Sequence, residues 1–402
     1  MSFASRGNHV ALMLASEINR LNAYCYEQGP IRPPSEGKSL LIRATRNCPW
    51  NRCLFCGTYS GRKFELRKVE EVKKDIDAAK ALADGIKEIS WKLGYGGATR
   101  QVAAMIYNSP QSNISLRSIA LWVYFNDNTA FLQDANSLIM RTHELVEVLR
   151  YLKEKFPQVQ RITSYARSKT AAKKTVDELK ELRQAGLDRL HIGLESGDDG
   201  VLEYMHKGVT AREHIEGGRK VKEAGISLSE YVMPGLGGRN MWQQHVKETA
   251  KVLNEIDPDF IRLRSLVVRR NTGLRTKYEE GDFEPRSEDE VVDEIAELVD
   301  RLDCNSYLVS DQMSNLLGSI EGTLPQDKDR MLASISGYRS LDPFAKLKAR
   351  LETRTGAFIS VYGTLEPLEE EVDEAFEAIK CESWDAAEKV EKIIFKLKDG
   401  FI

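Results

Sequence analysis

Two periods of apolar spacing alternate along the chain. Apolar residues recur every three to four positions in segments such as residues 142–156, where Leu145, Leu149, Leu152 and Phe156 share one face of a predicted helix. Short runs typical of strands lie between the helical segments. Six strands are predicted, in the segments SLLIRATR, NTAFLQDA, RITSYARS, DRLHIGLES, SLSEYVM and FIRLRSLVV.

This alternation predicts the fold class. Each strand but the last is clearly followed by a helix, and repeated βα units imply parallel strands. Six units predict an α/β protein with a partial (βα)6 TIM-like barrel, whose site lies at the carboxyl ends of the strands. From about residue 285 the pattern is mainly helical, which predicts a helical C-terminal part.

The same pattern predicts three parts of the chain. Residues 1–37 form an N-terminal helical segment, residues 38–280 the barrel, and residues 281–402 the helical C-terminal region. Within the barrel, a helix beginning near residue 68 is expected to end at Gly85, because glycine suits the left-handed cap position. The segment IKEIS that follows is compatible with a strand.

An insertion at about residues 91–127 interrupts the barrel pattern and is rich in aromatic side chains. They are Trp91, Tyr95, Trp122, Tyr124 and Phe125. One interpretation is a lid that covers the site and contributes to substrate choice, since a closed site excludes water. The other is a local packed cluster.

Composition indicates an ordinary globular protein in the cytoplasm. Of 402 residues, 42% are hydrophobic and 30% charged, and the formal net charge is −3. Because no global basic field is present, nucleic acid is not the expected partner. The apolar run from Val10 to Ala15 is too short for a secretory signal, and no run is long enough to span a membrane. Scattered cysteines outside one cluster argue against a disulfide framework.

Three of the six cysteines, Cys48, Cys53 and Cys56, fall within nine positions directly after the first strand. A structural zinc site requires four ligands, and no histidine lies in this loop. A disulfide would leave an odd thiol. Three thiolates from one loop favour an iron–sulfur cluster with one iron that lacks a protein ligand, and zinc stays the alternative because both metals favour thiolates.

Cys48, Cys53 and Cys56, with Phe55 just before the last, resemble the cluster loop of the radical S-adenosylmethionine (SAM) superfamily. The resemblance covers roughly residues 38 to 275. It is nearest to the branch that contains tRNA methylthiotransferases and oxygen-independent coproporphyrinogen oxidases. It implies a 4Fe–4S cluster held by the three cysteines, with Phe55 near the adenine of SAM.

The activity that the resemblance implies is radical chemistry. Reductive cleavage of SAM yields a 5′-deoxyadenosyl radical that abstracts hydrogen from a substrate. An oxygen-sensitive enzyme and an electron donor such as flavodoxin or ferredoxin are therefore expected. Acidic pI and a possible arginine pocket favour a small anionic substrate.

The chain departs from the superfamily pattern in two places. The cysteine spacing is C-x4-C-x2-C, one residue longer than the commonest form. The Gly-Gly-Glu-like motif that holds the SAM amino group is replaced by LQDANS, where Gln133, Asp134 and Asn136 are the polar candidates. Asp134 is the candidate acceptor for the ammonium, and its alternative role is a turn or helix cap.

Further SAM contacts are expected at the ends of the next two strands. On the strand HIGLES, alternation places His191, Gly193 and Glu195 inside the barrel, where Glu195 resembles the ribose contact and Ser196 assists it. His191 has the alternative of a core histidine. Near the preceding strand's end, Ser164 and Arg167 are candidates, Arg167 for the SAM carboxylate or an ordinary salt bridge.

The last two strands supply the remaining candidates. Met233 and Gly235 lie in a stretch similar to the glycine-containing adenine site, although GLGG alone is a turn motif. Arg262 and Arg264 form an anion pocket if they face inward, which we favour because Ile261 and Leu263 must pack on helices. Ser310, Asp311 and Asn315 are further candidates to reach the site, with helix capping as the alternative.

Motifs that the sequence lacks narrow the range of expected functions. No second cysteine cluster or N-terminal cobalamin domain is indicated, which weighs against methylthiotransferase and cobalamin-dependent functions. The rival hypothesis is a non-catalytic zinc–thiolate protein or an iron–sulfur electron carrier on a barrel scaffold.

Overall fold

The computed structural model describes residues 3–400, which form two compact units. The first contains the chain up to Pro49, Gly61–His191 and Lys220–Ser227, and the second contains Trp50–Ser60, Ile192–Arg219 and the chain from Leu228 on. The loop that carries the clustered cysteines is divided between them. In the part of the chain described, no helix is both long and apolar enough to span a membrane.

The strands confirm the predicted α/β class. In the first unit β1 (Leu40–Arg43), β4 (Thr129–Gln133) and β5 (Arg161–Ala166) are parallel neighbours. β6 (Leu187–Glu195) begins in this unit and ends in the second. There, β7 (Ser227–Val232), β8 (Phe260–Leu263) and β9 (Tyr307–Val309) are parallel, and β10 (Gly322–Thr323) is antiparallel to β9. Strand order follows chain order, as in a partial βα barrel.

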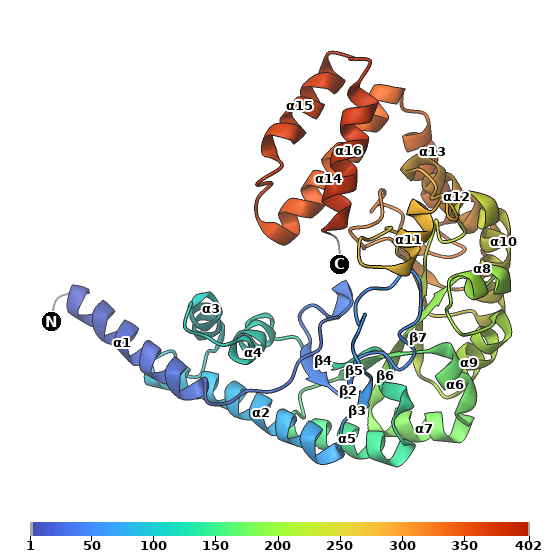
Figure 1. Ribbon diagram of the computed structural model, residues 1–402. Helices are drawn as coiled ribbons and strands as arrows, with labels where there is room; N and C mark the ends of the chain where they lie inside the picture. The colour runs from blue at the N-terminus through green and yellow to red at the C-terminus, as the bar shows by residue number, and fades with distance from the viewer. Residues whose placement is uncertain (1–2, 401–402) are drawn as a thin grey trace. The chain divides into compact units, whose positions relative to one another are not determined.

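Helices alternate with these strands (Figure 1). In the first unit the helices α2, α5 and α7 pack in a row. The helices up to β8 are α1 (Phe3–Leu21), α2 (Val69–Lys92), α3 (Arg100–Asn108), α4 (Ile114–Phe125), α5 (Thr142–Lys155), α6 (Ser168–Lys173), α7 (Val176–Ala185), α8 (Asp199–Tyr204), α9 (Ala211–Glu223) and α10 (Gly238–Ile256). Two 3-10 turns, Pro34–Glu36 and Ser137–Ile139, lie before β1 and after β4.

Local sequence explains several of these boundaries. Before α7, the Thr175 hydroxyl accepts a hydrogen bond from the Glu178 amide, and the Glu178 carboxylate accepts one from the Thr175 amide. This pair of bonds is a capping box. Gly186 ends the helix with a φ of 112°. Ser287 and Glu290 repeat the box at α12 (Glu288–Arg301).

The prediction that Gly85 ends its helix was wrong. α2 continues to Lys92, and the segment IKEIS is helical. A Cβ at Gly85 would lie 2.4 Å from Cδ2 of Leu21, so this glycine permits the close approach of α1 to α2. Close packing, which the local pattern does not show, accounts for the residue.

The insertion contains the end of α2, then α3 and α4, all in the first unit. Trp122 is buried, and its ring meets that of Phe156 edge-on at 5.4 Å between centroids. Trp91 is 63% exposed. The aromatic residues are therefore divided between packing and surface positions.

The C-terminal region is mainly helical, as predicted, but also contains β9 and β10. α11 (Gly273–Glu279) precedes this region, within the range predicted for the barrel, and the region's own helices are α12, α13 (Lys328–Arg339), α14 (Pro343–Tyr362), α15 (Glu369–Lys380) and α16 (Ala386–Asp399). Leu351, Val372, Val390 and Leu397 belong to the core that joins α14, α15 and α16.

A buried charge network joins α12 to these helices. Glu288 pairs with Arg350 at 3.0 Å and Arg354 at 2.5 Å. Burial alone would raise the pKa of Glu288, but Lys398, Arg354 and Arg350 lower it to about 2. Arg354 also donates to the carbonyl oxygens of Met313 and Asn315, which fixes the loop after β9.

Candidate functional site

The cysteine loop begins on an antiparallel ribbon in the first unit. β2 (Thr45–Arg46) pairs with β3 (Glu65–Leu66), and this pairing closes the base of the loop. Asn47 has a φ of 66°, in the left-handed region that asparagine tolerates, and its side chain donates to the Lys63 carbonyl at 2.6 Å. The ribbon and this bond fix the chain direction immediately before Cys48.

The middle of the loop is tied to another segment of the second unit. The Leu54 amide donates to the Met205 carbonyl at 3.0 Å, and the Trp50 indole donates to the His206 carbonyl at 2.6 Å. A Cβ at Gly208 would lie 2.1 Å from the Trp50 ring, so only glycine fits there. These two bonds and the close approach at Gly208 hold this part of the loop against the segment from Met205 to Gly208.

The donor set fits an iron–sulfur cluster. Cys48 lies in the first unit, and Cys53 and Cys56 lie in the second. No disulfide links the cysteines in the described part of the chain, and the Cys56 amide donates to the Cys53 carbonyl at 3.1 Å. Between residues 3 and 400, the structure gathers no group of three or more metal-ligating side chains. The fit therefore rests on the three thiols and their loop.

The candidates after β4 are engaged within the first unit. The Gln133 amide donates to the Gly29 and Ile31 carbonyls and accepts from the Gly29 amide. Oδ2 of buried Asp134 accepts from Arg43 at 2.6 Å and from the Asn47 amide at 3.1 Å. These bonds give Asp134 a direct role in holding the approach to Cys48.

At the ends of β4 and β5, Asn136 is linked to Arg167, and Ser164 is linked to the β4 backbone. The Asn136 side chain accepts from the Arg167 amide at 3.2 Å and donates to Thr170 at 2.9 Å. The Ser164 hydroxyl donates to the Leu132 carbonyl at 3.1 Å. The structure thus places these three residues at neighbouring strand ends, with Arg167 half-buried.

Glu195 ends β6 in an unusual backbone conformation, with a φ of 65°. Its Oε1 pairs with Nζ of Lys207 at 3.0 Å, while its buried Oε2 has no hydrogen-bond partner among the residues described. A Cβ at Gly193 would lie 2.3 Å from Oε1, so the glycine makes room for this carboxylate. One carboxylate oxygen remains for a ligand.

Lys207 was not predicted from the sequence. Its ammonium lies 5.8 Å from the centroid of the Phe55 ring, so it connects Glu195 with the cysteine loop inside the second unit. It lies in a turn between His206 and Gly208, both with positive φ. In the sequence, a single lysine in a turn that binds a ligand looks the same as a lysine that is exposed to solvent.

Glu230 on β7 was also missed. It is fully buried, and neither carboxyl oxygen has a hydrogen-bond partner in the described part of the chain. Burial raises the pKa of Glu230 well above 4.5; the charge of Lys207 lowers it and that of Glu195 raises it further. A protonated carboxyl in this environment can donate a hydrogen bond as well as accept one.

Met233 and Gly235 lie beside the end of β6. The Met233 amide donates to the Glu195 carbonyl at 3.0 Å. Gly235 has a φ of 87°, and its amide donates to Glu294 at 2.7 Å. The predicted contacts on β6 and β7 are therefore neighbours in the second unit.

The two arginines of β8 differ in environment. Arg262 is buried and pairs with Asp311 at 2.7 Å, whereas Arg264 is exposed. The Asn315 side chain accepts from the Ser265 amide at 2.8 Å and donates to the Leu263 carbonyl at 2.7 Å. Asp311 and Asn315 thus support β8, and Ser310 is buried nearby in sequence.

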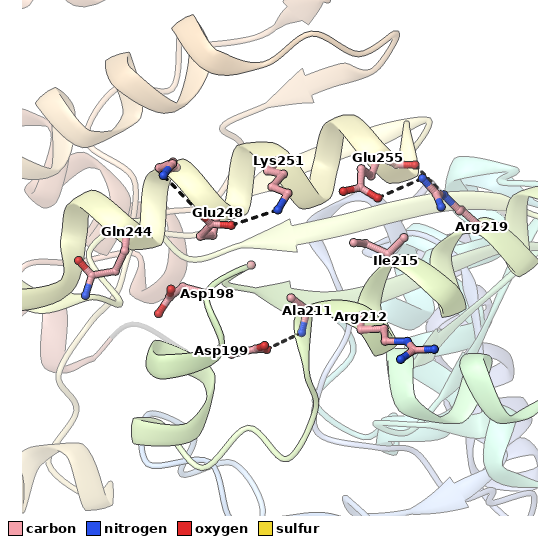
Figure 2. A pocket seen from close by; sticks show the side chains of 12 residues that line it. Asp198, Asp199, Ala211, Arg212, Ile215, Arg219, Gln244, Glu248, Lys251 and Glu255 are labelled. Atoms are coloured by element: carbon pink, nitrogen blue, oxygen red, sulfur yellow. Dashed lines mark hydrogen bonds and ion pairs between the residues drawn. The ribbon is translucent and has the colours of Figure 1, made fainter.

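An open hollow of about 650 Å³ lies elsewhere in the second unit, along α9 and α10 (Figure 2). Its charges are largely paired with each other: Arg219 with Glu255, and Lys251 with Glu248. Of the predicted cofactor residues, none lines it. The hollow therefore lacks the chemistry of the candidate site.

Comparison with known proteins identifies the central part of the chain. Residues 128–253 match the model of the Radical SAM superfamily. This confirms the superfamily resemblance, although the matched range does not include the cysteine loop.

Curated relatives are distant and matched in part. The tRNA uridine(34) acetyltransferase of Methanocaldococcus jannaschii is 24% identical over 121 residues, 30% of this chain and 22% of the relative. The uncharacterized protein YtqA of Bacillus subtilis is 26% identical over 157 residues, 38% of this chain and 47% of the relative. The matches span less than half the length of each.

The solved structures that resemble this chain are also distant from it in sequence. The coproporphyrinogen III oxidase of Escherichia coli, a radical SAM enzyme, has 14% identity and a TM-score of 0.41 over 70% of this chain and 54% of its own. Methylornithine synthase has 13% identity and a TM-score of 0.41 over 83% and 77%. Likeness at this level carries no functional weight.

Proposed function

We propose that this chain, a member of the radical SAM superfamily, binds a 4Fe–4S cluster through Cys48, Cys53 and Cys56 and abstracts hydrogen from a small anionic substrate. The observation that carries the proposal is the cysteine loop itself. It presents three thiols and no fourth protein ligand, and backbone bonds to the segment around Met205 hold it. When bound, the cluster supplies the electron that cleaves SAM to methionine and the 5′-deoxyadenosyl radical.

Glu195 and Lys207 are the proposed binding pair for SAM. The open Oε2 of Glu195 accepts hydrogen bonds from the ribose hydroxyls, and the Lys207 ammonium attracts the methionine carboxylate. Phe55, beside Lys207, offers an apolar face to the adenine. Ser196, Met233 and Gly235 complete this edge through the backbone of the two neighbouring strand ends.

The polar residues of the first unit have supporting roles in this proposal. Asp134 and Arg43 orient Asn47 and hence Cys48, and Asn136 holds the backbone of Arg167. Arg167, through its side chain, is the proposed partner of a SAM or substrate carboxylate. Gln133 and Ser164 hold the chain around these groups.

A small anionic substrate is supported by charge. Exposed Arg264 lies at the end of β8, beyond Arg262, which Asp311 already pairs, and the net charge of −3 gives no general attraction for nucleic acid. The acetyltransferase relative acts on tRNA according to its name, but it matches only 30% of this chain. We therefore do not extend that substrate to this protein. An electron donor such as flavodoxin or ferredoxin is the proposed partner.

Anaerobic reconstitution with iron and sulfide tests the proposal. The wild-type protein should develop a visible charge-transfer band, a paramagnetic signal on reduction that shifts when SAM is added, and 5′-deoxyadenosine with dithionite. Cys53→Ala should lose all three, while the matched control Cys25→Ala, an exposed cysteine outside the loop, should retain them.

Each alternative gives a different result. Bound zinc with no visible band would support the zinc–thiolate protein. An assembled cluster whose signal does not respond to SAM would support an electron carrier. Either result would overturn the proposed function.

A further inference from the structure

We propose that His245 on α10, together with Glu294 on α12, is a positioning residue that holds the ends of β6 and β7 in the arrangement that binds SAM. The inference rests on the proposed function and adds to it two residues outside the strands. All the contacts that carry it lie inside the second unit.

His245 bridges the two strand ends. It is 1% exposed, and its Nδ1 lies 2.8 Å from the Ser196 hydroxyl, directly after Glu195. The Met233 backbone lies near the ring and raises the pKa of His245. The Met233 amide donates to the Glu195 carbonyl, so the ends of β6 and β7 are already bonded to each other. The imidazole of His245 lies against both strand ends from the side of α10.

Glu294 holds the turn that follows β7. Its Oε1 accepts from the Gly235 amide at 2.7 Å and lies 3.5 Å from Nε2 of His245. Its Oε2 lies 3.3 Å from Arg286, whose guanidinium lies over the Trp242 ring at 4.1 Å. Gly235 is thereby fixed with a φ of 87° by a carboxylate from α12.

The protonation state of His245 agrees with this role. Burial lowers the pKa of His245 to about 4, and the Met233 backbone raises it only in part. A neutral imidazole has one donor and one acceptor nitrogen. The Ser196 hydroxyl can donate to Nδ1 while the N–H at Nε2 faces Oε1 of Glu294 at 3.5 Å, so both contacts form together.

The Ser–His–Glu series does not form a nucleophilic triad. Ser196, His245 and Glu294 are all buried, and the Ser196 hydroxyl accepts from the Asp198 amide at 3.1 Å. The Gly197 amide likewise donates to Thr249 on α10 at 2.8 Å. These bonds hold the turn after β6 and leave no exposed hydroxyl for attack.

Backbone strain explains why such a support is needed. A non-glycine residue at positive φ is strained and persists only when its surroundings impose it. Glu195 is such a residue, and it carries the open carboxylate oxygen. Without His245, the strand end can relax and move this carboxylate away from its ligand.

The test compares two buried histidines of the same unit in reconstituted full-length protein. His245→Phe keeps a ring but removes both contacts, and His214→Phe on α9 is the matched control. Iron content, melting temperature and the SAM dissociation constant by equilibrium dialysis are measured for each. We expect His245→Phe to weaken SAM binding about tenfold or more, and His214→Phe to leave it within about threefold.

Two further variants separate an effect on SAM binding from a general loss of folding. His245→Gln, which can restore one bond, should recover part of the affinity, and Glu294→Met should weaken SAM binding with iron content unchanged. Equal SAM affinity in wild-type protein and His245→Phe, or equal losses in both histidine variants, would overturn the inference alone. Absence of SAM binding by wild-type protein with an assembled cluster would overturn the proposed function as well.

Discussion

Polar groups at the strand ends are used differently in the two units. In the first unit, Asp134 accepts from Arg43 and Asn47, and Asn136 accepts from Arg167. In the second unit, buried oxygens of Glu195 and Glu230 have no hydrogen-bond partner among the residues described. The same residue types therefore stabilise the fold in one unit and remain open in the other.

The difference separates carboxylates that stabilise the fold from those that we propose to bind a ligand. A buried polar group without a partner costs about 1–3 kcal/mol, so a protein retains one where a ligand completes its bonds. A carboxylate whose oxygens are already hydrogen-bonded inside the protein has no free acceptor for a ligand. Substitutions should therefore affect stability in the first unit and affect ligand binding or pH response in the second.

The largest effect is expected for Asp134→Ala. Removing it takes one of two carboxylate partners from the Arg43 guanidinium, which is 11% exposed and keeps Glu27 at 2.7 Å, and breaking a buried pair costs up to about 3–5 kcal/mol. The free energy of unfolding from denaturant titration measures the loss. Exposed Glu181→Ala in the same unit is the control and should change it by less than about 0.5 kcal/mol. Equal stability of both variants would refute a structural role for Asp134.

A smaller, pH-dependent effect is expected for Glu230→Gln. The folded-state pKa of Glu230 is raised, so its stabilising contribution is complete below pH 4.5 and is lost as pH rises towards the folded pKa. In that range the wild-type protein should lose up to about 1.4 kcal/mol per pH unit relative to Glu230→Gln.

Unfolding free energies from about pH 5 to about pH 8 measure this difference. Exposed Glu203→Gln is the control and should follow the wild-type curve. Parallel curves for wild-type protein and Glu230→Gln would show that Glu230 has no raised pKa.

The smallest change in free energy is expected for Glu195→Gln. The substitution weakens the bond to Lys207 and removes the charge of the open oxygen, so SAM affinity should fall about 10- to 100-fold, or about 1.4–2.7 kcal/mol. The melting temperature should change little, because Oε2 stabilises nothing within the described chain. Calorimetric SAM titration of the reconstituted protein measures the effect. A large fall in melting temperature with unchanged affinity would place Glu195 with the structural carboxylates.

The candidate site could be proposed from the sequence, because its motifs depend on local order. The cysteine spacing and the strand ends carrying Glu195 and Met233 are sequence features, and the match to the Radical SAM superfamily over residues 128–253 includes the two strand ends but not the cysteines. Lys207 and Glu230 were missed because their importance depends on neighbours distant in sequence. The same holds for Gly85, whose role is contact with Leu21 in another helix.

The sequence by itself determined the alternation of strands and helices, the α/β class and the crowding of three thiols, since periodicity and spacing are properties of short segments. Only the tertiary structure decided which polar groups remain open. Asp134 and Glu195 both follow buried strands and look equivalent in the sequence. Arg43 reaches the first, and nothing described reaches Oε2 of the second, because hydrogen bonding depends on which side chains the fold brings within about 3 Å.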